Sequence, residues 1–219
     1  AAAGRVTIGS IEFGLASVRA GDVRIELADG GFVEVPQATV GLSLRRFLTS
    51  GFRPARSLGT AVLTAPRVVI VTGAAAESAR ARAPFDPASV FAKLPDRVSI
   101  SDASVTVVDR GGAWSFGVRS LDVVARRQDR RRFEADVSGG CLGSDDNVTG
   151  ALLWDEASGT LSAGARMTGG TLSGGDLPLP GAPVRPLSGR VSASVDAALR
   201  RGAPAAWTVA FEIFDSDLA

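Results

Sequence analysis

The chain has 219 residues, of which 45% are hydrophobic, and its 24 basic and 23 acidic residues give a formal net charge of +1. That balance argues against a partner held by overall charge, such as nucleic acid. Histidine is absent and Cys141 is the single cysteine, so the chain cannot build a Ser-His-Asp triad, an internal disulfide or a Cys/His metal centre. The carboxylates are scattered over turns and outward strand positions. We therefore expect no enzyme, no cofactor and no metal site.

Apolar residues alternate with polar or small ones through most of the chain, first around Val23 and Val33 and again around Val105 and Phe116. This period of two is typical of strands with one buried and one wet face. Glycine-rich turns separate the runs. The sequence predicts an all-β fold in which repeated long antiparallel hairpins form a curled, groove-like sheet.

Two short helices interrupt the strands. The first is predicted from Arg45 to Ser50, and the second from Phe85 to Leu94 with Asp86 as N-cap and Pro87 at the first helical position. The segment at 177–186 is proline-rich, and because proline has no backbone N–H, it has too few donors to form a central strand.

An internal repeat organises the chain, with copies at about 5–72 and 85–175 and a partial third copy at 187–219. When Val23 is aligned with Ala103, Ile25 and Leu27 fall on Val105 and Val107. Both copies also switch apolar parity, near Asp22 and near Asp102. Such switches are β-bulges or bends that curl a sheet. We treat the whole chain as one β-rich unit.

The alternation predicts one apolar face shared by both hairpins. Its members are Val23, Ile25, Leu27, Val33, Val35, Val40 and Leu42 in the first copy and Val105, Val107, Trp114, Phe116, Leu121 and Val123 in the second. These residues either pack as an ordinary core or line a groove. The other large side chains in such runs include Trp154 and Trp207, for which core or groove lining is a better explanation than a stacking site for sugars or bases.

A basic cluster is predicted at a hairpin tip, formed by Arg126, Arg127, Arg130, Arg131 and Arg132. Arginine forks suit phosphate, so the cluster is a candidate contact for anionic lipid head groups. The alternative is a solvated loop that protects a sheet edge. In either case we expect these side chains to be exposed and dispensable for folding.

Two segments carry a family resemblance. The run Leu94–Asp109 (LPDRVSISDASVTVVD) and the run Ser57–Val71 (SLGTAVLTAPRVVIV) resemble the strand units of AsmA-like proteins, which include the TamB-like members. The resemblance covers most of the chain through hydrophobic patterns. It implies a periplasmic segment of a longer protein of a Gram-negative envelope, anchored to the inner membrane by a helix that this sequence does not contain.

That resemblance also implies a function and partners. The leading hypothesis is a β-groove that shields phospholipid acyl chains and conducts them between the inner and outer membranes, next to flanking repeats of the same protein. One alternative is an assembly module that binds strands of client outer-membrane proteins by edge pairing. Another is an adhesin-like β-solenoid.

Overall fold

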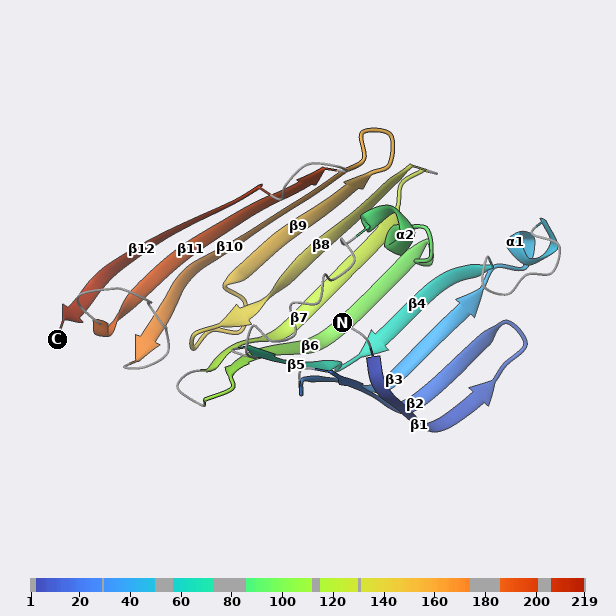
Figure 1. Cartoon of the computed structure of the whole chain (residues 1–219), viewed down its shortest axis with the longest axis horizontal. Coiled ribbons are helices and arrows are strands. Elements are labelled where there is room, and N and C mark those ends of the chain that lie inside the picture. Colours follow the sequence, from blue (N-terminus) through green and yellow to red (C-terminus); the bar gives the residue numbers. More distant parts are fainter. Residues whose placement is uncertain are drawn as a thin grey trace.

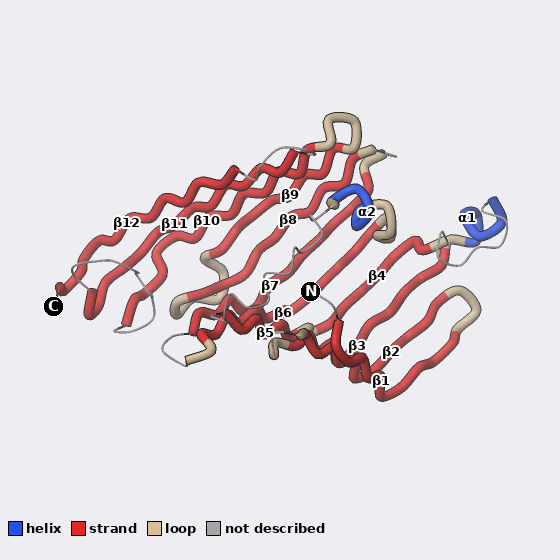
Figure 2. Tube along the Cα trace, viewed as in Figure 1, coloured by secondary structure: helices blue, strands red, loops and turns tan. Residues whose placement is uncertain are grey.

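The computed structural model describes residues 3–28, 30–49, 57–72, 86–111, 115–129, 131–173, 186–200 and 206–218. The strands are β1 (Ala3–Phe13), β2 (Ser17–Leu27), β3 (Phe32–Leu42), β4 (Leu58–Thr64), β5 (Arg67–Thr72), β6 (Arg97–Asp109), β7 (Ser115–Arg127), β8 (Arg132–Cys141), β9 (Val148–Asp155), β10 (Thr160–Ser173), β11 (Pro186–Arg200) and β12 (Ala206–Leu218). The helices are α1 (Leu44–Thr49) and α2 (Pro87–Phe91). The predicted fold class is confirmed: the strands form one large, curled, mostly antiparallel sheet (Figures 1 and 2).

One junction departs from the antiparallel pattern. β4 and β5 together act as one broken strand, because both pair with β3 in antiparallel fashion and with β6 in parallel fashion. Ala65 and Pro66 separate them, and Ala65 has a left-handed backbone with φ of 49°. A parallel pair requires a crossover connection, and here that connection includes α2. The turn signals predict antiparallel hairpins throughout, so they do not predict the parallel pairing of β4 and β5 with β6.

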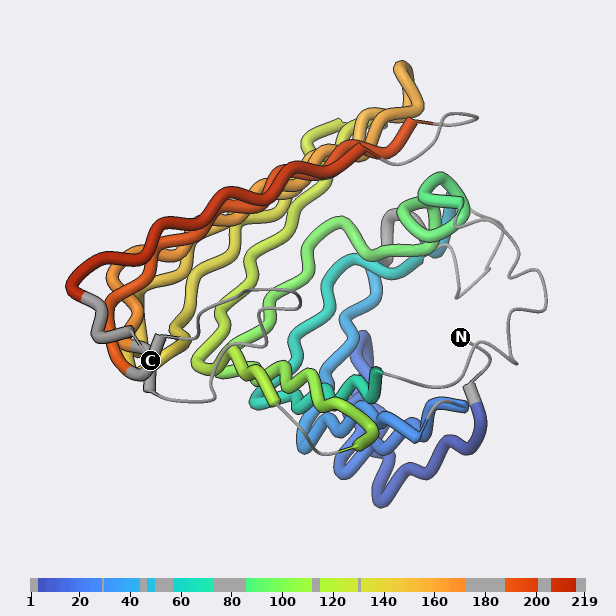
Figure 3. The backbone as a smooth tube through the Cα atoms, turned by 60° about the vertical axis from the view of Figure 1, so that its left-hand side comes forward, coloured from blue at the N-terminus to red at the C-terminus, as the bar shows by residue number. Residues whose placement is uncertain are grey.

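A line of bends crosses the sheet. Asp22, Ala65, Asp102 and Ser120 all have φ between 49° and 53°. The register of the sheet places them at about the same level on β2, between β4 and β5, on β6 and on β7. The Ala65 N–H donates to the Ser101 carbonyl at 2.8 Å, one residue before Asp102. Strands turn along this line, so that the sheet is curled (Figure 3). The parity switches in the sequence are therefore real bends.

The two main copies of the repeat form matching hairpins. β2 and β6 run in the same direction, and each forms an antiparallel hairpin with the strand that follows it. β11 runs in the opposite direction, because five antiparallel pairings separate it from β6. The partial third copy therefore starts on a strand of reversed direction, and β11 forms an antiparallel hairpin with β12.

Local signals place α2 where the sequence predicts a helix. The Asp86 carboxylate accepts a hydrogen bond from the Ala88 N–H at 3.2 Å, as an N-cap does. The helix is shorter than expected, since it ends at Phe91. The proline-rich segment at 177–186 lies outside the described residues except for Pro186, which begins β11.

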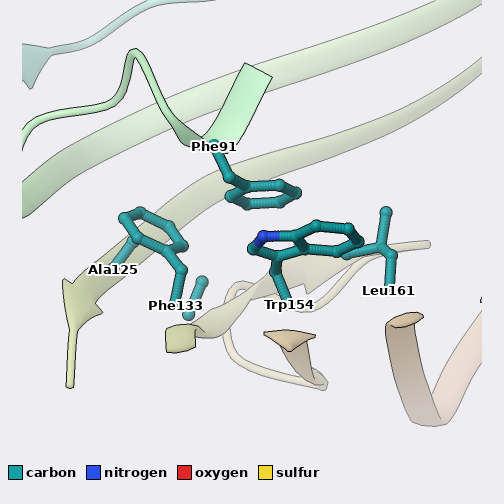
Figure 4. Close-up of a cluster of buried hydrophobic side chains, with 6 residues drawn as sticks. Phe91, Ala125, Phe133, Trp154 and Leu161 are labelled. Atoms are coloured by element: carbon teal, nitrogen blue, oxygen red, sulfur yellow. The ribbon is translucent and has the colours of Figure 1, made fainter. Parts of the chain in front are cut away.

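The main core lies between α2 and the sheet. Phe91 stacks on Trp154 with ring centroids 5.5 Å apart and planes 7° from parallel, and it also meets Phe133 at 5.3 Å (Figure 4). Ala125, Ala135 and Leu161 complete this buried cluster. Aromatic pairs of this kind add about 0.5–1.5 kcal/mol beyond the burial of their area. A five-residue helix is thereby fixed to four strands.

Candidate functional site: an apolar trough

Cross-strand pairing assembles the apolar residues of the second hairpin on one face. Val107 lies opposite Phe116, Val105 opposite Val118, Ala103 opposite Leu121 and Ile100 opposite Val123. Directly paired residues project to the same side of a sheet. The bends at Asp102 and Ser120 keep the apolar set on that side, since each strand changes parity there.

The first hairpin repeats this arrangement. Val23 lies opposite Val35, and Ile25 lies opposite Val33. Val40 is paired with Val18, Leu42 with Leu58 and Leu27 with Ala3. The two hairpins are joined through β5, because Val68 pairs with both Val33 and Val105. Of the predicted lining residues, the structure brings all the described ones onto the same face, and Trp114 lies outside the described residues.

The opposite face is more polar. Arg24 forms an ion pair with Glu34, and its guanidinium lies 4.6 Å from the centre of the Phe32 ring. On the second hairpin, Ser115 and Asp122 alternate with the apolar set and are exposed. The sheet therefore has one apolar and one mostly polar surface, although Val62, Val124 and Leu153 are exposed outside the apolar set.

The apolar face is the inner face of the curl. α2 packs on it, because the cluster around Phe91 includes Val123 from the apolar set and Val98, which lies on the same face. Figures 1 and 3 show α2 on the side toward which the bent strands fold. The inner surface is therefore a trough that runs across the strands. α2 covers it over β7 to β10.

The trough remains apolar at both edge strands. On β1, Val6, Ile8, Ile11 and Phe13 are 47–82% exposed, and on β12, Trp207, Val209 and Phe211 are 47–72% exposed. Register places these residues on the inner face, since Phe13 pairs with Val18 and Trp207 with Ala197. The predicted lining set omits the β1 residues, although their alternation over 6–13 is a signal that indicates them.

One expectation about the arginine cluster is wrong. The Arg127 side chain is only 16% exposed, and its Nε lies 3.3 Å from the Asp96 carboxylate. A terminal nitrogen donates to the carbonyls of Phe91 at 2.7 Å and Leu94 at 3.2 Å. β7 continues as far as Arg127, so parity turns this residue to the inner face with Ala125. Arg127 holds the C-terminal end of α2 and is not a free tip residue.

The other described arginines of the cluster lie at the end of β7 and around the start of β8, where parity turns Arg126 and Arg132 to the outer face. Arg126 is exposed and 3.9 Å from Glu134, and Arg132 is exposed and 3.9 Å from Asp155. Arg131 is exposed, and its N–H donates to the Asp129 carboxylate at 2.6 Å. Arg130 lies outside the described residues. A head-group contact by these arginines stays a prediction.

Cys141 behaves as a small core residue. It is 2% exposed, its Sγ lies 2.9 Å from the Met167 Sδ, and burial raises the pKa of its thiol. The turn that follows is fixed by Asn147, whose side-chain oxygen accepts from the Cys141 N–H at 2.9 Å. Over the described part of the chain, no three Cys, Asp or Glu residues are grouped in a way that could hold a metal ion.

The fold and the site together define an open, curled β-sheet with an apolar inner trough. No protein-family model matches the chain, and none of the curated proteins matches it either. Among the described residues, neither helix is long and apolar enough to cross a membrane.

Proposed function

We propose that this chain is a segment of a periplasmic β-groove protein that shields phospholipid acyl chains and conducts them between the inner and outer membranes. The observation that supports this function is the continuity of the apolar trough across the strands to both edges of the sheet. Flanking repeats of the same protein would extend it. The anchor to the inner membrane would lie in sequence outside these residues.

The energetics favour an occupant for the trough. Soluble proteins rarely expose large contiguous apolar patches, and those that do use them for binding. Each square ångström of apolar surface removed from water contributes about 25 cal/mol. An acyl chain laid along Val105, Val107 and Phe116 therefore binds favourably, because its own surface and that of these side chains are both removed from water. A lipid needs no fixed hydrogen-bond partner along its tail. A face built from alternating valine, alanine and leucine suits such a ligand.

The location rests on the resemblance of Leu94–Asp109 and Ser57–Val71 to AsmA-like strand units. In the periplasm a lipid tail would have to cross an aqueous space, and an open trough would shield it while leaving the head group in water. Arg126, Arg131 and Arg132 are exposed near the ends of β7 and β8, and arginine side chains are suited to phosphate. This function requires no catalytic residue.

Site-specific photo-crosslinking tests the proposal. A photo-reactive amino acid at Val107 or Phe116 is expected to crosslink to phospholipid, because both side chains lie on the inner face. The matched controls are Thr106 and Ser115, their neighbours on the outer face. Crosslinked lipid is detected by mass spectrometry of the purified adduct. Equal crosslinking at both parities, or none at either, removes the groove function.

The edge strands favour a second candidate, an assembly module that pairs with strands of client outer-membrane proteins. Among the described residues, β1 and β12 each pair along one side only. Edge pairing supplies affinity through the main chain and needs no lipid. Crosslinks from the edge strands to an outer-membrane protein, together with the absence of lipid at Val107 and Phe116, would support this candidate.

A further inference from the structure

We propose that a polar pocket on the outer face of the sheet, between β7 and the turn that follows β8, binds a small sugar that carries a phosphate or carboxylate group. The pocket lies on the opposite face from the apolar trough. It is therefore a second site, and it does not depend on what the trough carries.

The floor of the pocket is the outer face of β6 and β7 beyond the line of bends. Thr106 pairs with Gly117. Ser104 and Ser115 have the same parity as this pair, so all four residues point away from the apolar trough. Neighbours on one face of a sheet lie about 5 Å apart across strands and about 7 Å apart along a strand. The three hydroxyl groups are therefore close enough to contact one small ligand.

The wall of the pocket is the turn after β8. Leu142 and Gly143 have positive φ of 49° and 87°, so the chain leaves the line of β8 there. The turn folds over the outer face, because a Cβ atom at Gly140 would overlap the backbone of Ser144. The Thr171 N–H donates to the Leu142 carbonyl at 2.8 Å and fixes the turn to β10. The hollow between the turn and the floor has a volume of about 480 Å³, which is in the usual range for small-molecule sites.

The side chains around this hollow favour an anion that also carries hydroxyl groups. Arg119 pairs with Gly140 on the outer face, is exposed, and forms no ion pair within the described part of the chain. A guanidinium group binds phosphate or carboxylate through parallel N–H donors, and serine and threonine hydroxyls both donate to and accept from the hydroxyls of a sugar. Among the described residues, the lining contains no carboxylate that would repel an anion. The lining side chains with these properties are those of Ser104, Thr106, Ser115, Thr171 and Arg119.

Titrations with glucose 6-phosphate and with glucuronate, followed by nuclear magnetic resonance, test the pocket. The amide signals of Gly117 and Gly143 are expected to shift with at least one of these probes, with a dissociation constant below about 1 mM. Glucose and inorganic phosphate are expected to bind at least tenfold more weakly, because each supplies only part of the contacts. Unchanged signals at both glycines, or equal affinity for glucose or inorganic phosphate, would overturn the proposal.

Variants of the lining test the same assignment. Arg119→Gln is expected to weaken binding at least tenfold, because it removes the charge. Gly117→Leu is expected to abolish binding by filling the floor, and it is expected to fold, since a Cβ atom at this position lies no closer than 3.7 Å to the Thr106 hydroxyl. Arg126→Gln is the matched control, because Arg126 lies on the outer face of the same strand and outside the pocket, and it is expected to retain the wild-type affinity.

Circular dichroism checks that each variant is folded. Equal affinity of the wild type and the Arg119 variant would contradict the assignment, and so would an equal loss in the Arg126 variant. No lipid enters these measurements, so their failure leaves the groove function untouched.

Discussion

Asp22 and Asp102 occupy equivalent places in the two main copies of the repeat and share one unusual backbone conformation, with φ of 52° and 53°. Each interrupts the first strand of a bent hairpin, and each stands where the apolar residues change parity. Aspartate tolerates the left-handed region better than most residues, whereas β-branched residues are strained there. The repeat therefore preserves a bend as well as a hydrophobic pattern, and that bend gives the sheet its inner face.

Replacement of Asp102 tests the bend. Asp102→Val is expected to lower the free energy of unfolding by about 1–3 kcal/mol, since a β-branched residue must keep a positive φ there. Asp102→Gly is the matched control and is expected to change stability by less than about 1 kcal/mol, because glycine adopts this conformation without strain. Urea denaturation gives both values. A valine variant as stable as the glycine variant would show that the bend does not depend on this φ.

The stack beneath α2 gives a second prediction. Phe91→Ala removes the ring that meets Phe133 and Trp154, and it is expected to cost about 3–5 kcal/mol of stability. Val90, the preceding residue, is 41% exposed, so Val90→Ala is expected to stay within about 0.5 kcal/mol. Similar thermal unfolding of the two variants would mean that α2 is not fixed to the sheet by Phe91.

Much of this architecture is accessible from the sequence because strands report their faces through parity. Val105 and Val107 alternate with outward residues, and the change of apolar parity near Asp102 predicts the bend. The contact of Phe91 with Trp154 is different, because it joins segments far apart in the chain through a parallel crossover that no local pattern encodes. Arg127 was misplaced for a related reason: a run of arginines is typical of a loop, but β7 extends into it.

The arginines of the cluster are expected to differ in how much each contributes to the stability of the protein. Arg127→Met is expected to cost about 1–3 kcal/mol, because it removes the guanidinium from the carbonyls of Phe91 and Leu94 and from the Asp96 carboxylate in a partly buried site. Arg131→Ser is expected to change stability by less than about 0.5 kcal/mol, as exposed charges generally do. Thermal denaturation compares the two. Equal effects would mean that Arg127 contributes no more than a surface residue.

Cys141 gives a prediction on reactivity. Burial raises the pKa of its thiol, so the reactive thiolate is a smaller fraction at a given pH than in an exposed cysteine, and the side chain is also shielded. Alkylation by iodoacetamide at pH 8 is expected to be at least tenfold slower in the folded protein than in urea. Mass spectrometry follows the adduct. Equal rates would indicate that the end of β8 opens readily.

A charge placed in the trough tests its use by lipid. Val105→Asp puts a carboxylate on the inner face between Val68 and Val118, where an acyl chain would have to lie against it. Contact between an unpaired charge and hydrocarbon costs several kcal/mol, which is more than a tenfold change in affinity requires. The variant is therefore expected to retain at least tenfold less phospholipid after incubation with vesicles of phosphatidylethanolamine and phosphatidylglycerol. Thr106→Asp, the neighbour on the outer face, is expected to retain the wild-type amount. Circular dichroism establishes that both variants remain folded, and equal lipid retention by the two would contradict passage along the inner face.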